Sequence, residues 1–326
     1  MHPIVGIVNT NSRSPFSRKF LRSQLASIRA HPLGQNIQLL FTAQAGDAEK
    51  LTRRALEDGC EAVLSIGGDG THNEVVNGFF DRQGNLIRPK TCLAVFPGGT
   101  GGDFRKTLEI GNTASEALVA LQAARLRPMD IGRVRFHDRT GRPVRRYFVN
   151  IASVGLSGLV DRYAADARFH RFGGKGAYVL ATLRAFLRFR NQWLRIYLDR
   201  EPAIAQRVCT LAAANGRFFG GGMKVAPRAR VDDGLFDVVC LGDFDLIDFL
   251  FSGHRLYRGL HTAMAKVWIR RARRVRVESE TPVPIDVDGE AAGYTPFEVS
   301  MASERIPVFA AGVRAFSPDN ARAQTS

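Results

Sequence analysis

Residues 62–78 of the chain read AVLSIGGDGTHNEVVNG. The apolar run 62–66 has the length and composition of a strand that is buried on both faces. Gly67, Gly68 and Gly70 follow this run, and residues 71–80 have helical spacing. Because glycine permits tight turns and close approach to a ligand, this order of strand, loop and helix predicts a binding loop at the carboxyl edge of an open α/β sheet.

The composition of this loop favours a phosphate group that arrives with a cation. N–H groups at the start of a helix attract anions, and Thr71 and Glu74 have the spacing of a capping box. A glycine pair after a strand is by itself more typical of a tight turn. The carboxylate of Asp69, however, is unfavourable among anion-seeking N–H groups unless a cation joins it, and the Mg²⁺ carried by ATP would supply that cation.

A second glycine loop has the same setting. Residues 96–105 read FPGGTGGDFR, and they follow the apolar run 93–96 and precede a helix. Taken alone, this segment is a reasonable surface connection, but beside the first loop it predicts a shared crevice at the sheet edge. The chain contains neither a Walker A sequence nor a GxGxxG fingerprint, so the nucleotide would be held without a P-loop lysine.

The first part of the chain alternates strands and helices. Strands are expected at 4–8, 37–41, 62–66 and 93–96, and helices at 16–30, 48–58, 71–80 and 115–125. This alternation predicts a Rossmann-like parallel sheet with helices on both faces, an α/β fold.

From about residue 128 the chain reads mostly as strands. They are expected at 130–136, 145–151, 193–198, 208–215, 235–241, 274–278, 284–287 and 297–301, with helices at 177–190 and 246–258. Short strands at this spacing predict an antiparallel β-sandwich. We therefore divide the chain into an α/β nucleotide-binding domain at 1–127, a β-sandwich domain at 128–317 and a disordered tail at 318–326. A last strand near 307–313 is a candidate for returning to the first domain.

The chain is strongly basic, with a formal net charge of +15 and a sequence pI of about 10.4. Residues 125–200 hold 17 Lys and Arg against 5 Asp and Glu, a net +12. Such a balance favours nucleic acid, an acidic membrane surface or a phosphorylated substrate, although an ordinary solvated surface is equally consistent with it. No nucleic-acid-binding motif accompanies the charge, so a nucleic-acid partner is not expected.

The cysteines and the chain start favour a cytoplasmic protein. Cys60, Cys92, Cys209 and Cys240 form no CxxC pair and have no histidine at zinc-finger spacing. The first residues lack the pattern of a signal peptide, and no run approaches the roughly 18 apolar residues of a spanning helix. A lipid substrate would be reached by peripheral association with the inner face of the membrane, and a homodimer is left open.

Five segments resemble a known family. GGDGTHNEVVNG at 67–78 resembles the signature of the diacylglycerol kinase catalytic family, which includes bacterial lipid kinases and sphingosine kinases; GGDG alone would also fit NAD kinases and phosphofructokinases. PGGTGGDF at 97–104 resembles the family's loop P-x-G-T-x-N-D-F, with Gly102 in place of the family's Asn. The segments FVNIASVG at 148–155, FGGGMKVAP at 219–227 and VDDGLFD at 231–237 resemble parts of its second domain.

The resemblance implies an ATP-dependent lipid kinase. The enzyme would transfer the γ-phosphoryl group of Mg·ATP to a hydroxyl group of diacylglycerol or a related lipid at an anionic membrane surface. The implied nucleotide contacts are Thr42, Gly67, Gly68, Asp69, Gly70, Thr71, His72, Asn73 and Thr100. The family's second-domain metal site matches the backbone near Arg230, with Asp233 and Leu235. Asp69 is expected to reach the Mg²⁺ of the nucleotide, whereas the side chain of His72 is more typical of a helix residue than of a base.

Phosphoryl transfer also needs a group that accepts the proton of the hydroxyl. Residues 287–290 read VDGE and present two acids at a glycine turn after a strand. On spacing alone this pattern is more typical of a solvated hairpin. The resemblance implies Glu290 as the proton acceptor, with Asp288 as its companion, so Glu290, Asp288 and Asp69 are the predicted catalytic residues.

Some alternatives remain open at this point. Residues 178–190 mix apolar residues with Arg184, Arg188 and Arg190, which fits either a helix in a membrane interface or a helix packed on the sandwich. An NAD kinase-like enzyme with a soluble substrate would share the GGDG loop. A catalytically silent lipid- or nucleotide-binding protein has Gly102 as its support.

Overall fold

The computed structural model describes residues 4–10, 15–98, 102–123, 126–166 and 173–310. The chain forms two compact units: unit 1 comprises residues 1–99, 105–129 and 304 onward, and unit 2 comprises residues 100–104 and 130–303. Residue 127, the boundary predicted from the sequence, lies in strand β5 (Leu126–His137), which passes from unit 1 to unit 2 after Met129. The predicted disordered tail lies outside the described residues.

Unit 1 is built on a parallel sheet. In spatial order its strands are β2 (Ile37–Thr42), β1 (Ile4–Asn9), β3 (Ala62–Gly67), β4 (Cys92–Pro97) and the end of β15 (Glu290–Phe309). Ile4 is in register with Ile37 and Ala62, and Val308 at the end of β15 pairs in parallel with Leu93. The carboxyl ends of four strands therefore meet at one edge.

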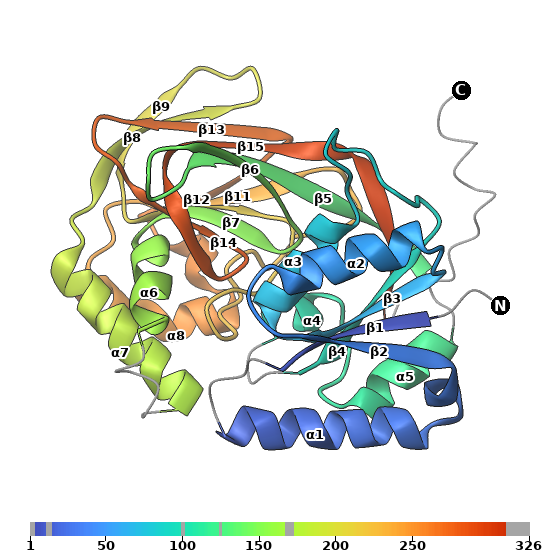
Figure 1. Cartoon of the computed structure of the whole chain (residues 1–326). Helices are drawn as coiled ribbons and strands as arrows, with labels where there is room; N and C mark the ends of the chain where they lie inside the picture. Colours follow the sequence, from blue (N-terminus) through green and yellow to red (C-terminus); the bar gives the residue numbers. More distant parts are fainter. Residues whose placement is uncertain (1–3, 11–14, 99–101, 124–125, 167–172, 311–326) are drawn as a thin grey trace. The chain divides into compact units, whose positions relative to one another are not determined.

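Helices cover both faces of this sheet, with α2 and α3 on one face and α1 and α5 on the other (Figure 1). The bounds are α1 (Pro15–Ala30), η1 (Pro32–Asn36), α2 (Asp47–Glu57), α3 (Asp69–Gly78), α4 (Asp103–Thr107) and α5 (Ala114–Gln122). In α2 the buried residues Ala48, Thr52 and Ala55 recur at helical spacing, which explains why this stretch packs on the sheet. Thr113 and Glu116 form a capping box that fixes the start of α5.

Unit 2 is an antiparallel sandwich. One layer runs β12-β11-β10-β7-β14-β15, and β15 also pairs with β13 and β5, which continue to β8, β9 and β6. The bounds are β6 (Pro143–Phe148), β7 (Ile151–Gly155), β8 (Gln192–Leu198), β9 (Ile204–Val208), β10 (Thr210–Ala214), β11 (Phe236–Leu241), β12 (Val267–Ala272), β13 (Arg274–Ser279) and β14 (Pro284–Val287).

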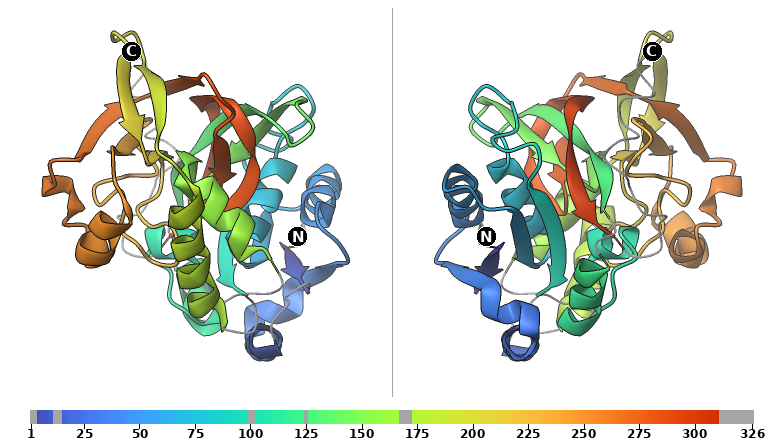
Figure 2. Two further views of the ribbon diagram at one scale, coloured as in Figure 1. Left: turned by 90° about the vertical axis from the view of Figure 1, so that its left-hand side faces the viewer. Right: turned by 90° about the vertical axis from the view of Figure 1, so that its right-hand side faces the viewer.

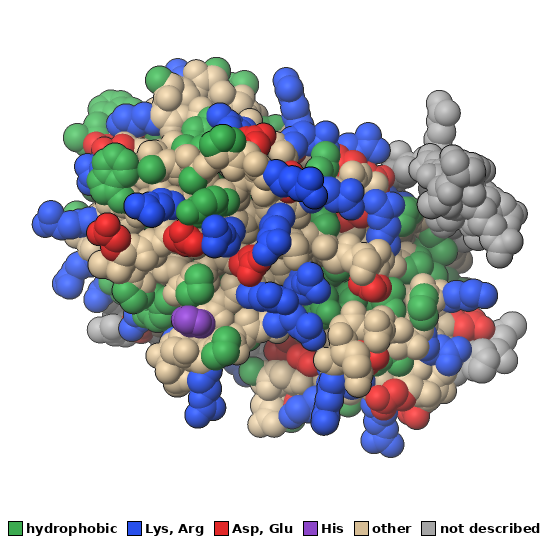
Figure 3. Space-filling view, turned by 90° about the horizontal axis from the view of Figure 1, so that it is seen from above, with side chains coloured by type: hydrophobic (Ala, Val, Ile, Leu, Met, Phe, Trp, Pro, Cys, Tyr) green, Lys and Arg blue, Asp and Glu red, His purple; other side chains and the backbone are tan. Residues whose placement is uncertain are grey.

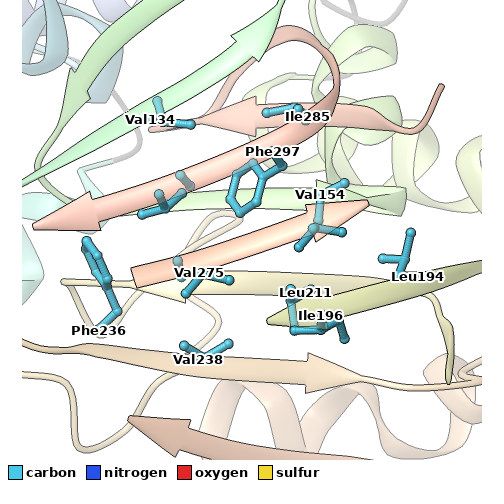
Figure 4. Close-up of a cluster of buried hydrophobic side chains, with 14 of the residues drawn as sticks. Val134, Val154, Leu194, Ile196, Leu211, Phe236, Val238, Val275, Ile285 and Phe297 are labelled. Carbon is cyan, nitrogen blue, oxygen red and sulfur yellow. The ribbon is translucent and has the colours of Figure 1, made fainter. Parts of the chain in front are cut away.

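Two apolar cores stabilise unit 2. The first fills the space between the strands, where Val154, Phe236, Ile285 and Phe297 point toward one another (Figure 4). The second lies between the sheet and three helices, α6 (Leu156–Ala164), α7 (Gly173–Arg188) and α8 (Leu246–Arg258), with η3 (His261–Ala263) after α8. Figures 1 and 2 place α7 and α8 below the strands of this unit.

The predicted fold class is confirmed: a parallel α/β unit is joined to an antiparallel β-sandwich. The single strand expected at 145–151 is wrong, because the chain breaks at Val149 and Asn150 between β6 and β7. The backbone N–H groups at this break donate to a carboxylate instead of to a strand, as described below. Helix α6 and the strands β9 and β12 were not expected from the sequence.

The strand expected at 297–301 is the middle of a longer one, because β15 runs from Glu290 to Phe309. Its last residues join the sheet of unit 1 beside β4. Within the described residues, which end at 310, this is the return expected near 307–313. Residues 311–313 lie outside the described part of the chain.

Candidate active site

Side chains link the ends of two parallel strands to the first turn of α3 in unit 1. Asn9, at the end of β1, donates from Nδ2 to Thr71 Oγ1 over 2.8 Å. Thr42, at the end of β2, lies with Oγ1 3.5 Å from Asn9 Oδ1, and Thr10 Oγ1 donates to the carbonyl of Thr42 over 2.7 Å. The predicted nucleotide residues Thr42 and Thr71 therefore share one hydrogen-bonded network through Asn9.

The two glycine loops touch through their backbones. Gly98 N–H donates to the carbonyl of Gly67 over 3.0 Å, and a Cβ on Gly98 would lie 2.6 Å from the Gly67 backbone. A Cβ on Gly67 would lie 2.4 Å from Thr71 Oγ1. These two glycines are thus required for packing, and they hold the loop after β3 against the loop after β4.

Gly68 differs from its neighbours, because a Cβ there would meet no heavy atom of the described residues within 4 Å. Its backbone is extended, with φ −99°, so the absence of a side chain is not required by conformation. The space above this loop is therefore open, as a binding loop for a polyphosphate would require. Gly68 is the N-cap residue of α3, and no side chain caps that helix.

The capping box predicted for Thr71 and Glu74 is wrong. Helix α3 begins at Asp69, three positions earlier than a Thr71 cap requires, and Thr71 Oγ1 accepts from Asn9 instead. Glu74 accepts from the N–H groups of Gly46 and Ala48 over 2.8 and 3.1 Å, so it ties α3 to the start of α2. Neither Thr71 nor Glu74 therefore caps the start of α3.

Two residues of the signature, His72 and Asn73, are buried and have polar partners inside the protein. His72 is buried, and its Nδ1 lies 2.7 Å from Ser65 Oγ. Burial lowers the pKa of His72 to about 3, so the ring is neutral at physiological pH. Asn73 is also buried, and its Oδ1 accepts from Asn77 over 3.2 Å. Neither side chain faces solvent.

Asp69 stands in the first turn of α3, half-buried, directly after the open position at Gly68. The start of a helix favours an anion, so an acidic residue at this position suits a polyphosphate only together with its cation. The residues present therefore fit Mg·ATP. Thr100, the remaining predicted nucleotide contact, lies outside the described residues.

The departure from the family at Gly102 has a conformational explanation. Gly102 has φ +91°, in the left-handed region that favours glycine and that asparagine tolerates best among other residues. Gly102 and the family's Asn thus suit the same backbone. The next residue, Asp103, accepts from Gly221 N–H over 2.7 Å, which ties this loop to the glycine turn at 220–222 within unit 2.

The predicted catalytic turn lies between β14 and β15. Asp288 and Gly289 have φ +50° and +84°, as a tight hairpin turn requires. The Asp288 carboxylate is buried and accepts from three backbone N–H groups, those of Val149, Asn150 and Ile151, at 3.0 Å each. Asp288 therefore fastens the turn to the break between β6 and β7.

Glu290 follows on the same turn but is positioned differently. Its side chain is 43% exposed and lies 3.4 Å from Arg146 Nη1 in a weak ion pair. Of the two acids, only Glu290 has a carboxylate that can reach a bound hydroxyl group without breaking backbone hydrogen bonds. The catalytic ranking, with Glu290 first and Asp288 second, stays a prediction.

A pair of buried carboxyl groups lies beneath this turn and was missed in the sequence. Asp161, on α6, is hydrogen-bonded to Asp286, on β14. Asp286 also accepts from Gly289 N–H over 2.8 Å and from Ser153 Oγ over 3.0 Å. Burial raises the pKa of Asp161 to about 6 and raises that of Asp286 well above its usual range, so burial favours the protonated form of this pair. No sequence spacing links residues so far apart.

The predicted metal residues of unit 2 lie on the turn before β11. Asp233 Oδ1 accepts from Leu235 N–H over 3.2 Å, Asp233 Oδ2 pairs with the Arg271 guanidinium, and Arg230 pairs with Asp232. Among the described residues, no cluster of three His, Cys, Asp or Glu side chains could hold a metal ion. A cation at Asp233 would have to displace Arg271, and the second-domain metal site stays a prediction.

An apolar cavity lies beneath the sandwich, inside unit 2. Its volume is about 60 Å³, and its walls come from α6, α7, α8 and the sheet. The lining residues include Val160, Phe186, Ala212, Phe249 and Leu256. Phe186 of α7 packs on Phe249 of α8 with ring centroids 5.2 Å apart. Helix α7 is therefore largely packed on the second core, as one of the two readings of this segment expected.

Comparison with known proteins places these features in a family. The model of the diacylglycerol kinase catalytic domain matches residues 3–134, and the model of the YegS C-terminal NAD kinase beta sandwich-like domain matches residues 150–310. Together the two matches span most of the chain.

Two similar curated proteins are named diacylglycerol kinases. The chain is 28% identical over 303 residues to a diacylglycerol kinase of Staphylococcus carnosus, covering 93% of each chain. It is 29% identical over 285 residues to a diacylglycerol kinase of Staphylococcus aureus, covering 87% of this chain and 85% of the relative.

Among solved structures, a putative diacylglycerol kinase from Bacillus anthracis is similar, with 22% identity and a TM-score of 0.71 over 95% of both chains. This likeness concerns the fold. Across the described residues, none of the helices combines the length and the apolar character that crossing a bilayer needs.

Proposed function

Because the chain belongs to the diacylglycerol kinase catalytic-domain family, we propose that it transfers the γ-phosphoryl group of Mg·ATP to a hydroxyl group of diacylglycerol or a related lipid. The single observation that carries the proposal is the loop after β3: Gly67 and Gly98 lock two loops together, and Gly68 opens onto free space at the uncapped start of α3. Such a loop suits phosphate oxygens rather than a neutral ligand.

In this proposal, unit 1 binds the nucleotide. Backbone N–H groups at the start of α3 would contact phosphate oxygens, and Thr42 and Thr71 would orient the nucleotide through the network at Asn9. Asp69 would hold the nucleotide's Mg²⁺, which supplies positive charge to the transferring phosphoryl group when it is bound. Such contacts position the phosphate chain and stabilise charge, and phosphoryl transfer depends largely on these two effects.

Unit 2 would supply the acceptor side of the reaction. The lipid hydroxyl oxygen forms a bond to the γ-phosphorus while the bond from that phosphorus to the β,γ-bridging oxygen breaks, so ADP leaves with the electron pair. The hydroxyl proton passes to the carboxylate of Glu290. Asp288, fastened by three N–H groups, and Asp286, bonded to Gly289, hold Glu290 in place.

The apolar cavity supports a lipid as the acceptor. Its lining is almost entirely apolar, as a site for part of an acyl chain would be. Because its volume of about 60 Å³ is close to two water volumes, an acyl chain would enter only as α7 and α8 move apart.

The proposal is tested with γ-³²P-labelled ATP and a panel of lipids: diacylglycerol, a sphingoid base, ceramide and phosphatidylglycerol. Labelled phosphatidic acid from diacylglycerol is the expected product. Label in another of these lipids would correct the substrate but keep the lipid kinase. No labelled lipid together with formation of NADP from NAD would replace the proposal with a soluble-substrate kinase, and ATP binding without any turnover would leave a silent binding protein.

A further inference from the structure

Helix α8 exposes apolar side chains on the face that points away from the core. Ile247, Leu250 and Phe251 are 65%, 63% and 76% exposed, and their spacing of i, i+3 and i+4 places them on one stripe. Phe249 and Leu256, on the opposite face, line the apolar cavity. A surface helix normally turns polar residues to water, so a helix that is apolar on both faces indicates a partner for the outer one.

The exposed apolar surface extends beyond this stripe. Tyr257 and Leu260 at the end of α8 are about half exposed, and Leu187 on the neighbouring helix α7 is 74% exposed. Phe186 and Phe249 join the two helices through their rings. We call the exposed side chains of both helices the α7–α8 surface: Val179, Leu187, Ile247, Leu250, Phe251, Tyr257 and Leu260.

Basic residues border this surface. Arg188 and Arg190 lie exposed at the end of α7, and Arg255 and Arg258 lie exposed in the last turn of α8. Within the described part of the chain, no carboxylate pairs with any of these four arginines. The nearby acids Asp243 and Asp248 pair instead with Arg207 and Lys266.

We propose that the α7–α8 surface inserts into the interface of a bilayer that contains anionic lipids, with α8 as the principal contact. Apolar side chains at i, i+3 and i+4 bordered by arginines are the features of a helix that lies in a membrane interface. The proposal rests on the lipid substrate of the proposed function, because the inserted helices are also the walls through which an acyl chain would reach the cavity.

A second copy of the chain fits this surface less well. A symmetric dimer through α8 would bring the same patch of both copies together, and the four arginines would then face the arginines of the partner. Anionic lipid headgroups would neutralise that charge. The opposite face of unit 2 offers a contrast: in the view from above, Lys and Arg are scattered with Asp and Glu between them (Figure 3). On strands β5, β13 and β15 of this unit, Arg135 and Arg274 pair with Glu298.

The test is co-flotation of the full-length protein with phosphatidylcholine vesicles, with and without phosphatidylglycerol. Wild type should float with the anionic vesicles. Because transfer of two large apolar side chains governs insertion, the double variant Leu250→Ser/Phe251→Ser should bind them about tenfold more weakly or worse. Trp193→Ser is the matched control: Trp193 is 65% exposed on β8, and its loss should leave binding unchanged. Arg255→Gln/Arg258→Gln should reduce the preference for phosphatidylglycerol.

A parallel assay separates this inference from the proposed function. The Leu250→Ser/Phe251→Ser variant should phosphorylate a short-chain diacylglycerol dispersed in detergent at the wild-type rate, but not diacylglycerol embedded in vesicles. Equal flotation of this variant and wild type, or no flotation of wild type, overturns the docking surface even if the kinase activity is present. So does a wild-type dimer that the variant converts to a monomer. Flotation of wild type without any labelled lipid supports the surface and counts against the lipid kinase.

Discussion

The turn at Gly67–Gly68 in unit 1 and the turn at Asp288–Gly289 in unit 2 both follow a buried strand, yet they treat backbone N–H groups in opposite ways. At the first, α3 starts without a side-chain cap and opens onto space at Gly68. At the second, the N–H groups of the adjacent break are already taken by Asp288. The first turn is thus arranged to receive an anion, whereas the second is filled by the chain's own carboxylate.

The difference assigns separate tasks to the two turns. A loop that presents the N–H groups of a helix start contributes to binding of phosphate, and its loss should weaken the affinity for ATP. A turn whose donors are satisfied internally contributes rigidity, so Glu290 is held by Asp288 and Asp286 rather than by the substrate. Variants at the two turns should therefore fail in different ways.

The largest effect is expected at Glu290. Glu290→Gln keeps the shape of the side chain but removes the proton acceptor, so turnover should fall roughly 10²–10⁴-fold. Arg146→Gln, which removes the half-buried cationic partner of the ion pair and leaves the Glu290 carboxylate in place, is the control and should lose far less turnover. Steady-state rates with labelled ATP give both numbers, and a Glu290→Gln variant within threefold of wild type would rule out the assigned base.

Asp288 should matter first for stability. Asp288→Ala leaves three N–H groups without their acceptor, and hydrogen bonds to a charged group are worth about 1.5–3 kcal/mol each, so unit 2 should lose about 3 kcal/mol or more. Asp288→Asn keeps one acceptor oxygen and tolerates the left-handed backbone, so its loss should be smaller. Thermal unfolding measures both, and an Asp288→Ala variant as stable as wild type would contradict the clamp.

The two kinds of glycine in unit 1 should separate binding from folding. Gly68→Ala adds a methyl group to open space, so the melting temperature should stay near that of wild type while ATP binds about tenfold more weakly, or about 1.4 kcal/mol. Gly98→Ala would clash with the Gly67 backbone and should lower the melting temperature. Calorimetric titration with Mg·ATP and a thermal melt distinguish them. Unchanged ATP affinity in Gly68→Ala would remove the phosphate loop from the account.

The smallest effect is a pH dependence. Because burial raises the pKa of Asp161 to about 6, the stability that the protonated pair contributes is present below about pH 4 and is lost as the pH rises through 6. The Asp161→Asn side chain cannot ionise. The melting temperature of this variant minus that of wild type should therefore increase as the pH rises from 4 to 7.

Asp138→Asn is the control for that series. Hydrogen bonds to Thr140 and Arg142 lower the pKa of Asp138, so its ionised form stabilises the fold above pH 4 and the sign is reversed. The Asp138→Asn variant should be less stable than wild type by an amount that stays constant between pH 4 and 7, because the pKa of Asp138 lies below that range. A difference between Asp161→Asn and wild type that stays constant with pH would show that the buried pair does not titrate.

Much of the fold could be predicted from local patterns. The loop at 67–73, the turn at 287–290 and the change from alternating elements to strands are all contiguous in sequence, and each carries its own spacing signal. The capping box at Thr71 was wrong because Asn9, sixty-two residues away, takes the hydroxyl instead. Likewise, only the carboxylate of Asp288 explains why the chain breaks at Val149.

Long-range pairs were beyond sequence reasoning. Asp161 and Asp286 meet through the packing of α6 on β14. Arg271, on β12, pairs with Asp233 on the turn before the neighbouring strand β11. The outer face of α8 was hidden for a related reason: apolar residues at 246–258 predict a helix, but which of them face the core depends on where α7 and the sheet lie.

The division of labour between the two turns is tested most directly by single-turnover transfer of labelled phosphate to the lipid, measured across ATP concentrations for wild type, Gly68→Ala and Glu290→Gln. We predict that Gly68→Ala reaches the wild-type rate once ATP is saturating, and that Glu290→Gln stays slow at every concentration with an unchanged half-saturation. The reverse pattern, with Glu290→Gln rescued by ATP and Gly68→Ala slow at saturation, would contradict the account.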